Sequence, residues 1–135
     1  MTQKKDIIVK GSSILEEKSK SWLACAIDTE GGIYLYHRKK KNGAYDGWSN
    51  HIEITNTNIE FLEHAKILMG GQIGNQTHKK DTKRKPCFKL RLCAQEKIQN
   101  ILEQIVPFLI IKKSKAEIML NFLRSHHDVR RRNYE

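Results

Sequence analysis

Residues 22–32 read WLACAIDTEGG, and this stretch decides the fold. Gly31-Gly32 is typical of a helix end, and the residues ahead of the two acids are small or apolar. A helix C-terminus carries partial negative charge, so Asp28 and Glu30 each cost about 0.3–1 kcal/mol there. We expect a positive group to offset this cost, and a divalent metal ion is one candidate. The small residues 24–26 permit close approach of another helix.

The chain has 135 residues, which fits one domain with a single core. It carries 25 Lys and Arg against 15 Asp and Glu, a formal net charge of +10. Such an excess indicates a polyanionic partner, nucleic acid before membrane, although charge that merely maintains solubility is the alternative. The three cysteines lack Cys-x-x-Cys spacing, which favours reduced thiols over a zinc site or disulfides.

No stretch is long and apolar enough to predict a membrane span, and the N-terminus lacks a secretory pattern. We therefore expect an intracellular protein, in the cytoplasm, the nucleoid or an organelle matrix, without a membrane partner.

The first half of the chain predicts a helix, two strands and a second helix. A capping-box pattern at 13–16 opens a helix that runs to Gly31. Alternating residues predict strands from Ile33 to about residue 40 and over 49–55, with a loop at 41–47 between them. A second capping box at 57–60 opens a helix that Gly70-Gly71 ends.

The second half repeats the order. Residues 72–80 predict a weak strand, 81–85 a charged turn, and 86–92 a strand that Pro86 opens. Helical spacing follows at 98–105, and a last helix begins at the cap Ser114. The two strand–strand–helix units suggest quasi-equivalent halves of one sheet. We predict an α+β fold of order αββαββα, with an N-terminal segment (1–12), one domain (13–124) and a basic C-terminal tail (125–135).

One face of the predicted sheet is apolar and the other polar. A polar face alone proves nothing, because an antiparallel sheet can leave one face in water. Here, however, it is rich in cations and hydrogen-bond donors, and strands can read base edges in the DNA major groove. We predict DNA contacts from the sheet and the adjoining loops, where cations such as Lys80 and Lys85 suit phosphates; the set is Tyr34, Tyr36, Arg38, Lys40, Ser49, His51, Glu53, Thr55, Gln76, His78, Lys80, Lys85, Lys89 and Arg91.

Residues 23–31, LACAIDTEG, together with the element order and the segment VPFLIIKK at 106–113, resemble the single-motif LAGLIDADG homing endonucleases. The resemblance covers about residues 13–124. It implies a homodimer in which the motif helices pack together across a twofold axis. It also implies a four-stranded saddle, with helices on one face, that lies over the major groove of a long, near-palindromic double-stranded DNA target. Members of the family cut both strands, and they spread introns by homing.

The resemblance also implies site residues. Glu30 matches the metal-binding acid, with Mg²⁺ as the usual ion; we expect Mn²⁺ to substitute and Ca²⁺ to bind without supporting cleavage. Asp28 matches the structural acid of the motif, Asn56 a residue that positions water, and Lys112 a basic catalytic residue. The dimer interface implied by the motif consists of Leu23, Ala24, Cys25, Ala26 and Ile27. Cys25 in place of the usual Gly and Glu30 in place of the commoner Asp depart from the family pattern.

Simpler interpretations exist for two of these residues. Lys112 is also consistent with an ordinary surface lysine, and Asn56 with an Asx turn ahead of the second helix. Two other functions fit the same fold: a splicing maturase that binds intron RNA, to which Arg130-Arg131-Arg132 would contribute, and a DNA-binding protein that has lost catalysis.

Overall fold

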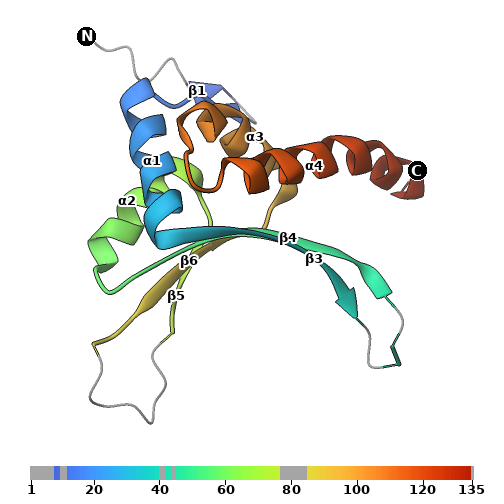
Figure 1. The fold of residues 1–135 in the computed structure, drawn as a ribbon, viewed down its shortest axis with the longest axis horizontal. Coiled ribbons are helices and arrows are strands. Elements are labelled where there is room, and N and C mark those ends of the chain that lie inside the picture. Colours follow the sequence, from blue (N-terminus) through green and yellow to red (C-terminus); the bar gives the residue numbers. More distant parts are fainter. Residues whose placement is uncertain (1–7, 10–11, 40–41, 44, 77–84, 135) are drawn as a thin grey trace.

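The helices lie together on one side of a curved four-stranded sheet (Figure 1). This computed structural model describes residues 8–9, 12–39, 42–43, 45–76 and 85–134. Along the chain the elements are β1 (Ile8–Val9), β2 (Ser12–Ser13), α1 (Glu17–Glu30), β3 (Gly31–Lys39), β4 (Tyr45–Asn56), α2 (Ile59–Met69), β5 (Gln72–Asn75), β6 (Phe88–Leu92), α3 (Gln95–Ile105), the 3₁₀ helix η2 (Val106–Phe108) and α4 (Lys113–Tyr134).

The sheet order is β3-β4-β6-β5, and every neighbouring pair is antiparallel. The two hairpins, β3–β4 and β5–β6, therefore join through the central strands β4 and β6. The predicted α+β fold, with its αββαββα order and its antiparallel sheet, is confirmed; β1 and β2 add a separate two-stranded hairpin.

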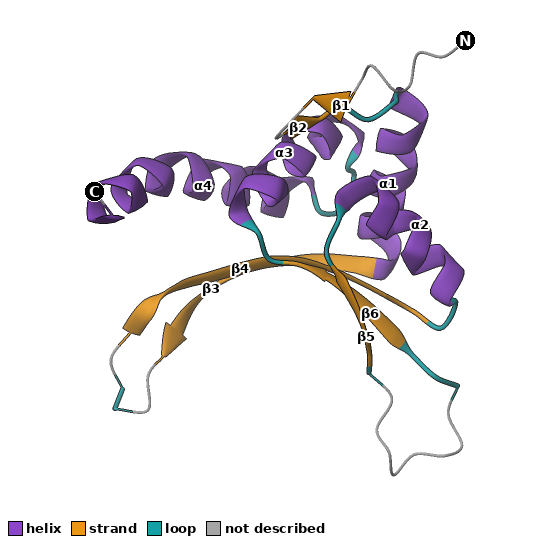
Figure 2. Cartoon of the chain, turned by 180° about the vertical axis from the view of Figure 1, so that it is seen from behind, coloured by secondary structure: helices purple, strands orange, loops and turns teal. Residues whose placement is uncertain are grey.

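The hydrophobic core lies between the helices and the convex face of the sheet. Leu23 and Ile27 of α1 are fully buried, as are Ile52 and Ile54 of β4 and Leu90 of β6. Burying each of these side chains contributes about 1.5–3 kcal/mol. None of the described helices covers the concave face, which lies between two downward-pointing hairpins (Figure 2). The alternation of apolar and polar residues along the strands therefore determines which side chains face the core and which face the concave side.

Two predicted helix starts are wrong. α1 begins at Glu17 rather than after Ser13, because Ser12 and Ser13 pair with Val9 and Ile8 in the β1–β2 ladder. α2 is capped by Asn58 rather than Thr57, since the Asn58 side chain accepts a hydrogen bond from the Phe61 N–H at 3.2 Å. At α1, strand pairing competes with the capping-box pattern. At α2, a neighbouring polar residue caps the helix instead.

Strand and helix lengths in the second half also differ from prediction. β5 ends at Asn75 within the described residues, and β6 begins at Phe88, two residues after Pro86. α4 begins at Lys113 and continues through Tyr134, so the segment interpreted as a tail from 125 is helical to residue 134. Among the described helices, none combines the length with the apolar composition that a bilayer crossing demands.

Gly31 allows the end of α1 to approach the sheet closely. α1 ends at Glu30 as predicted, but Gly31 has an extended backbone with φ −126°, so it is not a left-handed cap. A Cβ atom at Gly31 would lie 2.6 Å from the backbone carbonyl oxygen of Glu53 and 3.1 Å from Cα of Ile27. Close contact with β4 therefore requires glycine here.

We predict that Gly31→Ala lowers the free energy of unfolding by about 1–3 kcal/mol, because backbone atoms must move to admit the methyl group. Urea denaturation measures the change. Gly74→Ala is the matched control: it lies in a strand of the same sheet, and a Cβ there would meet nothing within 4 Å. Equal stability of the two variants would contradict the close-approach explanation.

Candidate functional site

The Asp28 carboxylate is bound by the backbone that leads into α4. It accepts hydrogen bonds from the N–H groups of Ile110 at 2.8 Å, Ile111 at 3.2 Å and Lys112 at 2.9 Å. The Lys112 Nζ donates to the backbone carbonyl oxygen of Asp28 at 2.8 Å. Asp28 is only 7 % exposed. This contact joins residues more than 80 positions apart and fixes the end of α1.

These contacts explain how an acid is tolerated at the carbonyl end of a helix. Burial raises the pKa of Asp28, but the three backbone hydrogen bonds and the Lys112 charge outweigh it, so the pKa lies below its ordinary value. The carboxylate sits just ahead of the α4 N-terminus, where negative charge is favoured. Asp28 therefore needs no metal ion as a counter-charge.

Glu30, the last residue of α1, is in the opposite situation. It is exposed, and among the residues that the structure describes none forms a hydrogen bond or ion pair with its carboxylate. It lines an open pocket of about 280 Å³ at the junction of α1 with the sheet, together with Thr29, Gly31, Gly32, Tyr34, Glu53 and Thr55. An uncompensated carboxylate at a negative helix end attracts cations.

The pocket fits a hard divalent cation that binds few protein ligands. Carboxylate oxygens suit Mg²⁺, which usually keeps several waters and substrate phosphates as ligands. The described part of the chain contains no group of three or more His, Cys, Asp or Glu side chains placed to hold a metal. The donors present thus suit an ion whose coordination is completed from outside this chain.

The two other predicted catalytic residues have structural contacts. The Asn56 Oδ1 accepts a hydrogen bond from the Asn58 N–H at 2.8 Å, which is the Asx turn considered above. The Lys112 ammonium lies against the Asp28 carbonyl, two residues before Glu30. Both residues lie next to elements that form the pocket, at the end of β4 and the end of α1.

An ionic cluster lies on the concave face of the sheet. Glu53 accepts a hydrogen bond from Arg91 Nε at 3.1 Å and also contacts Arg91 Nη2. The same Glu53 oxygen lies 3.4 Å from Lys89 Nζ and 2.9 Å from His51 Nε2. We call His51, Glu53, Lys89 and Arg91 the Glu53 cluster. The strand register brings these side chains together, because Glu53 of β4 pairs with Arg91 of β6.

The cluster fixes the charges of its members. Burial raises the pKa of Glu53, but Arg91, Lys89 and His51 outweigh burial and the pKa is lowered, so the carboxylate is ionised. Burial lowers the pKa of His51, against the opposing effect of Glu53, so the imidazole is neutral at pH 7. With Glu53 ionised and both cations charged, the cluster carries a net positive charge.

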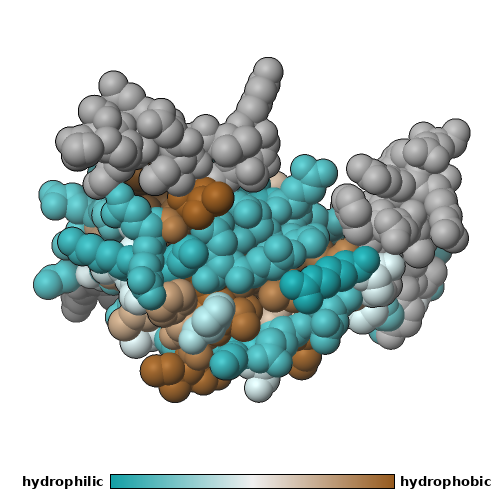
Figure 3. Space-filling model, turned by 90° about the horizontal axis from the view of Figure 1, so that it is seen from above, coloured by the Kyte–Doolittle hydropathy of each residue, from teal (hydrophilic) through white to brown (hydrophobic). Residues whose placement is uncertain are grey.

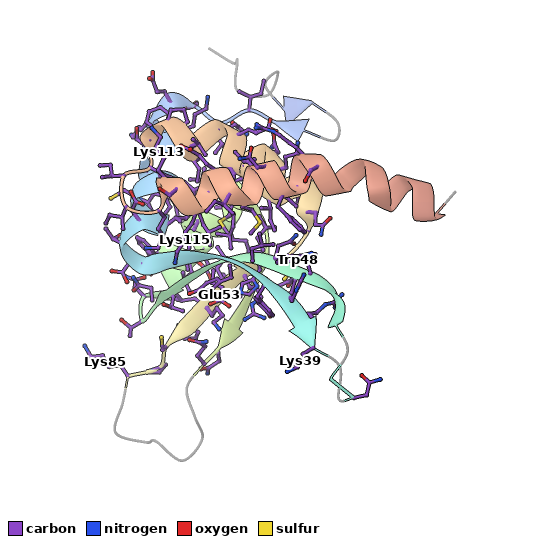
Figure 4. The ribbon with its side chains drawn as sticks, turned by 45° about the vertical axis from the view of Figure 1, so that its right-hand side comes forward. Lys39, Trp48, Glu53, Lys85, Lys113 and Lys115 are labelled. Carbon is purple, nitrogen blue, oxygen red and sulfur yellow. The ribbon has the colours of Figure 1, made fainter. Side chains whose placement is uncertain are left out.

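The predicted DNA-binding residues fall at different depths on this face. Arg91 is exposed and pairs with Glu53, which in turn pairs with Gly32 across the sheet. Glu53 lies beneath the sheet, between Lys85 and Lys39 toward the two ends of the concave face (Figure 4). The side chains of Tyr34, Tyr36, Arg38, Gln76 and Lys85 are also exposed, those of Ser49, Thr55 and Lys89 are half-buried, and His51 is 6 % exposed. Lys40, His78 and Lys80 lie outside the described residues.

Four of the five residues that the motif implies for a dimer interface, Leu23, Ala24, Ala26 and Ile27, are buried in the core of this chain. Cys25 is the exposed member of the set. The exposed face of α1 instead carries Ser21, Cys25 and Thr29, which line a hollow of about 220 Å³ with Asp28, Phe108, Ile110 and Ile111. The sequence signal for this exposed face is the four-residue spacing of Ser21, Cys25 and Thr29 along the helix.

This hollow is bordered by large exposed apolar side chains. Ile110 is 86 % exposed and Ile111 is 69 % exposed. Seen from the helical side, the described surface is largely hydrophilic, with several separate hydrophobic patches (Figure 3). We call the surface formed by Ser21, Cys25, Thr29, Ile110 and Ile111 the α1 face.

Solved structures with the same arrangement of helices and sheet are homing endonucleases. The archaeal intron-encoded I-Vdi141I complexed with DNA aligns with TM-score 0.67 and 19 % identity over 84 % of this chain and 72 % of its own. I-CvuI in complex with its target in the presence of calcium aligns with TM-score 0.64 and 16 % identity over 79 % and 66 %. The chain has the LAGLIDADG homing endonuclease fold.

The LAGLIDADG fold of this chain matches a part of each neighbour. The chain spans about two thirds of the I-CvuI chain and 39 % of the meganuclease I-SmaMI, which aligns with TM-score 0.66 and 15 % identity over 87 % of this chain. No sequence-family model and no curated protein sequence matches. At these identities the likeness establishes the fold.

We predict that Asp28→Asn destabilises the LAGLIDADG fold by about 2–3 kcal/mol at pH 7, because the amide cannot replace an ionised acceptor of three N–H groups. The pKa of Asp28 is lowered in the folded state. Its contribution is therefore fully present above the ordinary pKa of about 3.9 and is lost as the pH falls through the folded pKa. Urea denaturation at pH 7 and below pH 4 measures it.

Glu30→Gln is the control for Asp28→Asn, since Glu30 is an exposed acid at the same helix end without described partners. Its stability should stay within about 0.5 kcal/mol of the unmodified chain. A stability difference between Asp28→Asn and the unmodified chain that does not shrink in acid would contradict the assigned role.

Proposed function

We propose that this protein is a homodimeric, site-specific DNA endonuclease that hydrolyses both strands of a long, near-palindromic duplex with Mg²⁺. Mn²⁺ substitutes for Mg²⁺, and Ca²⁺ supports binding without cleavage. The biological role is the homing of the intron that carries its gene. The sequence motif, the fold and the neighbours solved in complex with DNA support this proposal.

One observation carries the proposal: Glu30, the motif's last acid, is uncompensated at the border of a cationic concave face. Asp28, two residues earlier, is fully engaged inside the protein. Glu30 has no described partner and lines a pocket that opens next to the Glu53 cluster. A purely structural motif would not leave this second acid free at a negative helix end.

The residues divide the chemistry of phosphodiester hydrolysis. Glu30 holds the metal ion, which when bound activates water and stabilises negative charge at the phosphate. Asn56 orients a water through its amide nitrogen, since its oxygen is held by the Asn58 N–H. Lys112 supplies positive charge at the carbonyl end of α1, where its ammonium already binds a backbone oxygen.

The concave face recognises the duplex. Arg91 is held by Glu53 through two donors, so its guanidinium meets DNA already oriented. Tyr36 and Arg38 are exposed on β3, the edge strand that pairs with β4. Lys85 is exposed shortly before the start of β6. Strand side chains in this arrangement reach base edges, and the outer cations reach phosphates.

The α1 face joins two copies. Among the described residues, Glu30 is the one carboxylate at the pocket without a partner, which suits a site completed by a second copy. Ile110 and Ile111 expose apolar surface beside Cys25, at the hollow that Ser21 and Thr29 also line. The 39 % coverage of I-SmaMI supports the same view, because one chain corresponds to less than half of that larger meganuclease. No described contact favours the RNA-binding alternative.

We predict that Glu30→Gln lowers the rate of cleavage at least about a hundredfold while leaving DNA binding in Ca²⁺ intact, because the metal loses its charged ligand. The target is first selected from a randomised duplex library by binding in Ca²⁺. Nicking and linearisation of a supercoiled plasmid that carries the selected duplex then measure cleavage in Mg²⁺.

Glu63→Gln, an exposed acid on α2, is the matched control and should cut at the unmodified rate. Cleavage by Glu30→Gln at that rate would reject the proposed site. Tight binding without any cleavage by the unmodified chain would identify a DNA-binding protein without catalysis.

We predict that Cys25 crosslinks two copies through a short bismaleimide, since the proposed twofold packing of α1 brings the two thiols together. The test uses a chain with Cys87→Ser and Cys93→Ser, in which Cys25 is the remaining cysteine. The control retains exposed Cys93 and carries Cys25→Ser and Cys87→Ser. Denaturing gels should show a dimer only for the first chain; crosslinking through Cys93 alone would contradict the α1 interface.

A further inference from the structure

Tyr34 extends into the pocket that Glu30 lines, although it belongs to the sheet. Tyr34 is 42 % exposed and lines this pocket with Gly32 and Glu53. A Cβ atom at Gly32 would lie 2.6 Å from the Tyr34 hydroxyl oxygen and 2.7 Å from two of its ring carbons. The side chain therefore runs back along β3 over Gly32, with its hydroxyl directed toward the end of α1.

Two contacts hold the ring in this position. The imidazole of His51, the cross-strand partner of Tyr34, stacks on it with ring centroids 4.8 Å apart and an interplanar angle of 23°. His51 is itself buried and held by Glu53 at 2.9 Å. The absence of a side chain at Gly32 provides the space for the ring. Tyr34 is thus pre-organised and does not need to move when a ligand arrives.

The Tyr34 hydroxyl is an unused donor beside carboxylates. Within the described part of the chain it forms no hydrogen bond. The charged side chains that line the pocket are those of Glu30 and Glu53, and both carboxylates accept hydrogen bonds. A phosphate that enters this pocket needs donors, and a hydroxyl that donates to an anion forms a strong, short hydrogen bond.

We propose that the Tyr34 hydroxyl donates a hydrogen bond to a DNA phosphate oxygen at the cut site or at the adjacent phosphate. Tyr34 is then a substrate-contacting residue of the nuclease site rather than a reader of bases. This inference rests on the proposed function, because it requires DNA in the pocket, but it concerns a separate group and a separate contact.

Tyr36 provides the matched control. It lies on the same strand and the same face, and it is also exposed. It contacts His51 edge-on with centroids 6.2 Å apart, and it does not line the Glu30 pocket. Tyr34→Phe and Tyr36→Phe each remove one hydroxyl from an exposed ring, so both variants should fold.

The first experiment measures equilibrium binding of the selected duplex in EDTA, where no cleavage occurs. Tyr34→Phe should weaken binding about ten- to a hundredfold, as expected for the loss of one hydrogen bond to a charged group. Duplexes that carry a single methylphosphonate at successive positions, in which a methyl group replaces a phosphate oxygen, then locate the contact. The effect of Tyr34→Phe should vanish at one position in each strand and persist elsewhere.

The second experiment measures single-turnover cleavage in Mg²⁺ at saturating protein. Tyr34→Phe should cut about tenfold or more slowly, as expected when a donor to a reacting anion is lost, and the α2 variant Glu63→Gln should cut at the unmodified rate. The inference is overturned if Tyr34→Phe binds and cuts like the unmodified chain, if Tyr36→Phe slows cleavage at saturating protein as much as Tyr34→Phe does, or if no methylphosphonate position removes the effect.

The outcomes separate this inference from the proposed function. If Glu30→Gln abolishes cleavage and Tyr34→Phe changes neither binding nor rate, the nuclease assignment stands and the Tyr34 contact fails. If the unmodified chain never cleaves, the nuclease assignment fails, and the methylphosphonate positions in EDTA still decide whether Tyr34 contacts a phosphate.

Discussion

The Asp28 carboxylate ties the carbonyl end of α1 to the segment that leads into α4, and the pocket depends on this contact. The three N–H groups satisfy the buried charge, while Lys112 binds the adjacent carbonyl. The close approach of Gly31 to β4 holds the same helix end from the other side. Glu30 lies between these two constraints, so its backbone is fixed while its side chain has no partner among the described residues.

The three acids of this region differ in how their charge is balanced. Asp28 is satisfied by backbone N–H groups, and Glu53 by Arg91, Lys89 and His51. Both have lowered pKa values because these partners outweigh burial. Glu30 has neither kind of partner among the described residues. The fold therefore neutralises two of the three acids internally and leaves the remaining one at the surface, where an external cation can bind.

Local periodicity predicted the sheet well and the helix surfaces poorly. Alternation with period two placed Tyr34, Glu53 and Arg91 on one face, because strand geometry leaves little choice. The family motif implies a continuous interface, although residues on one face of a helix recur only every three to four positions. The buried positions Leu23 and Ile27 consequently replaced Ser21 and Thr29 in the predicted interface.

Contacts between distant segments could not be found from spacing. The Asp28–Lys112 contact joins residues 84 positions apart. No local sequence pattern predicts that the N–H groups of Ile110 and Ile111 bind a carboxylate. The Glu53 cluster likewise depends on the register between β4 and β6, which are 38 residues apart at Glu53 and Arg91. Sequence reasoning names the residues of the candidate site but does not predict which of their charges pair with one another.

Three sides of α1 lie in three different surroundings, so the packing of this helix affects both folding and the proposed function. Leu23 and Ile27 face the core, Asp28 faces the α4 connection, and Ser21 and Cys25 face outward. The apolar surface of Ile110 and Ile111 lies next to the outward face, because the same segment supplies the N–H groups that bind Asp28. Any partner that covers this surface thus contacts the segment that fixes α1, and it does so beside the free carboxylate of Glu30.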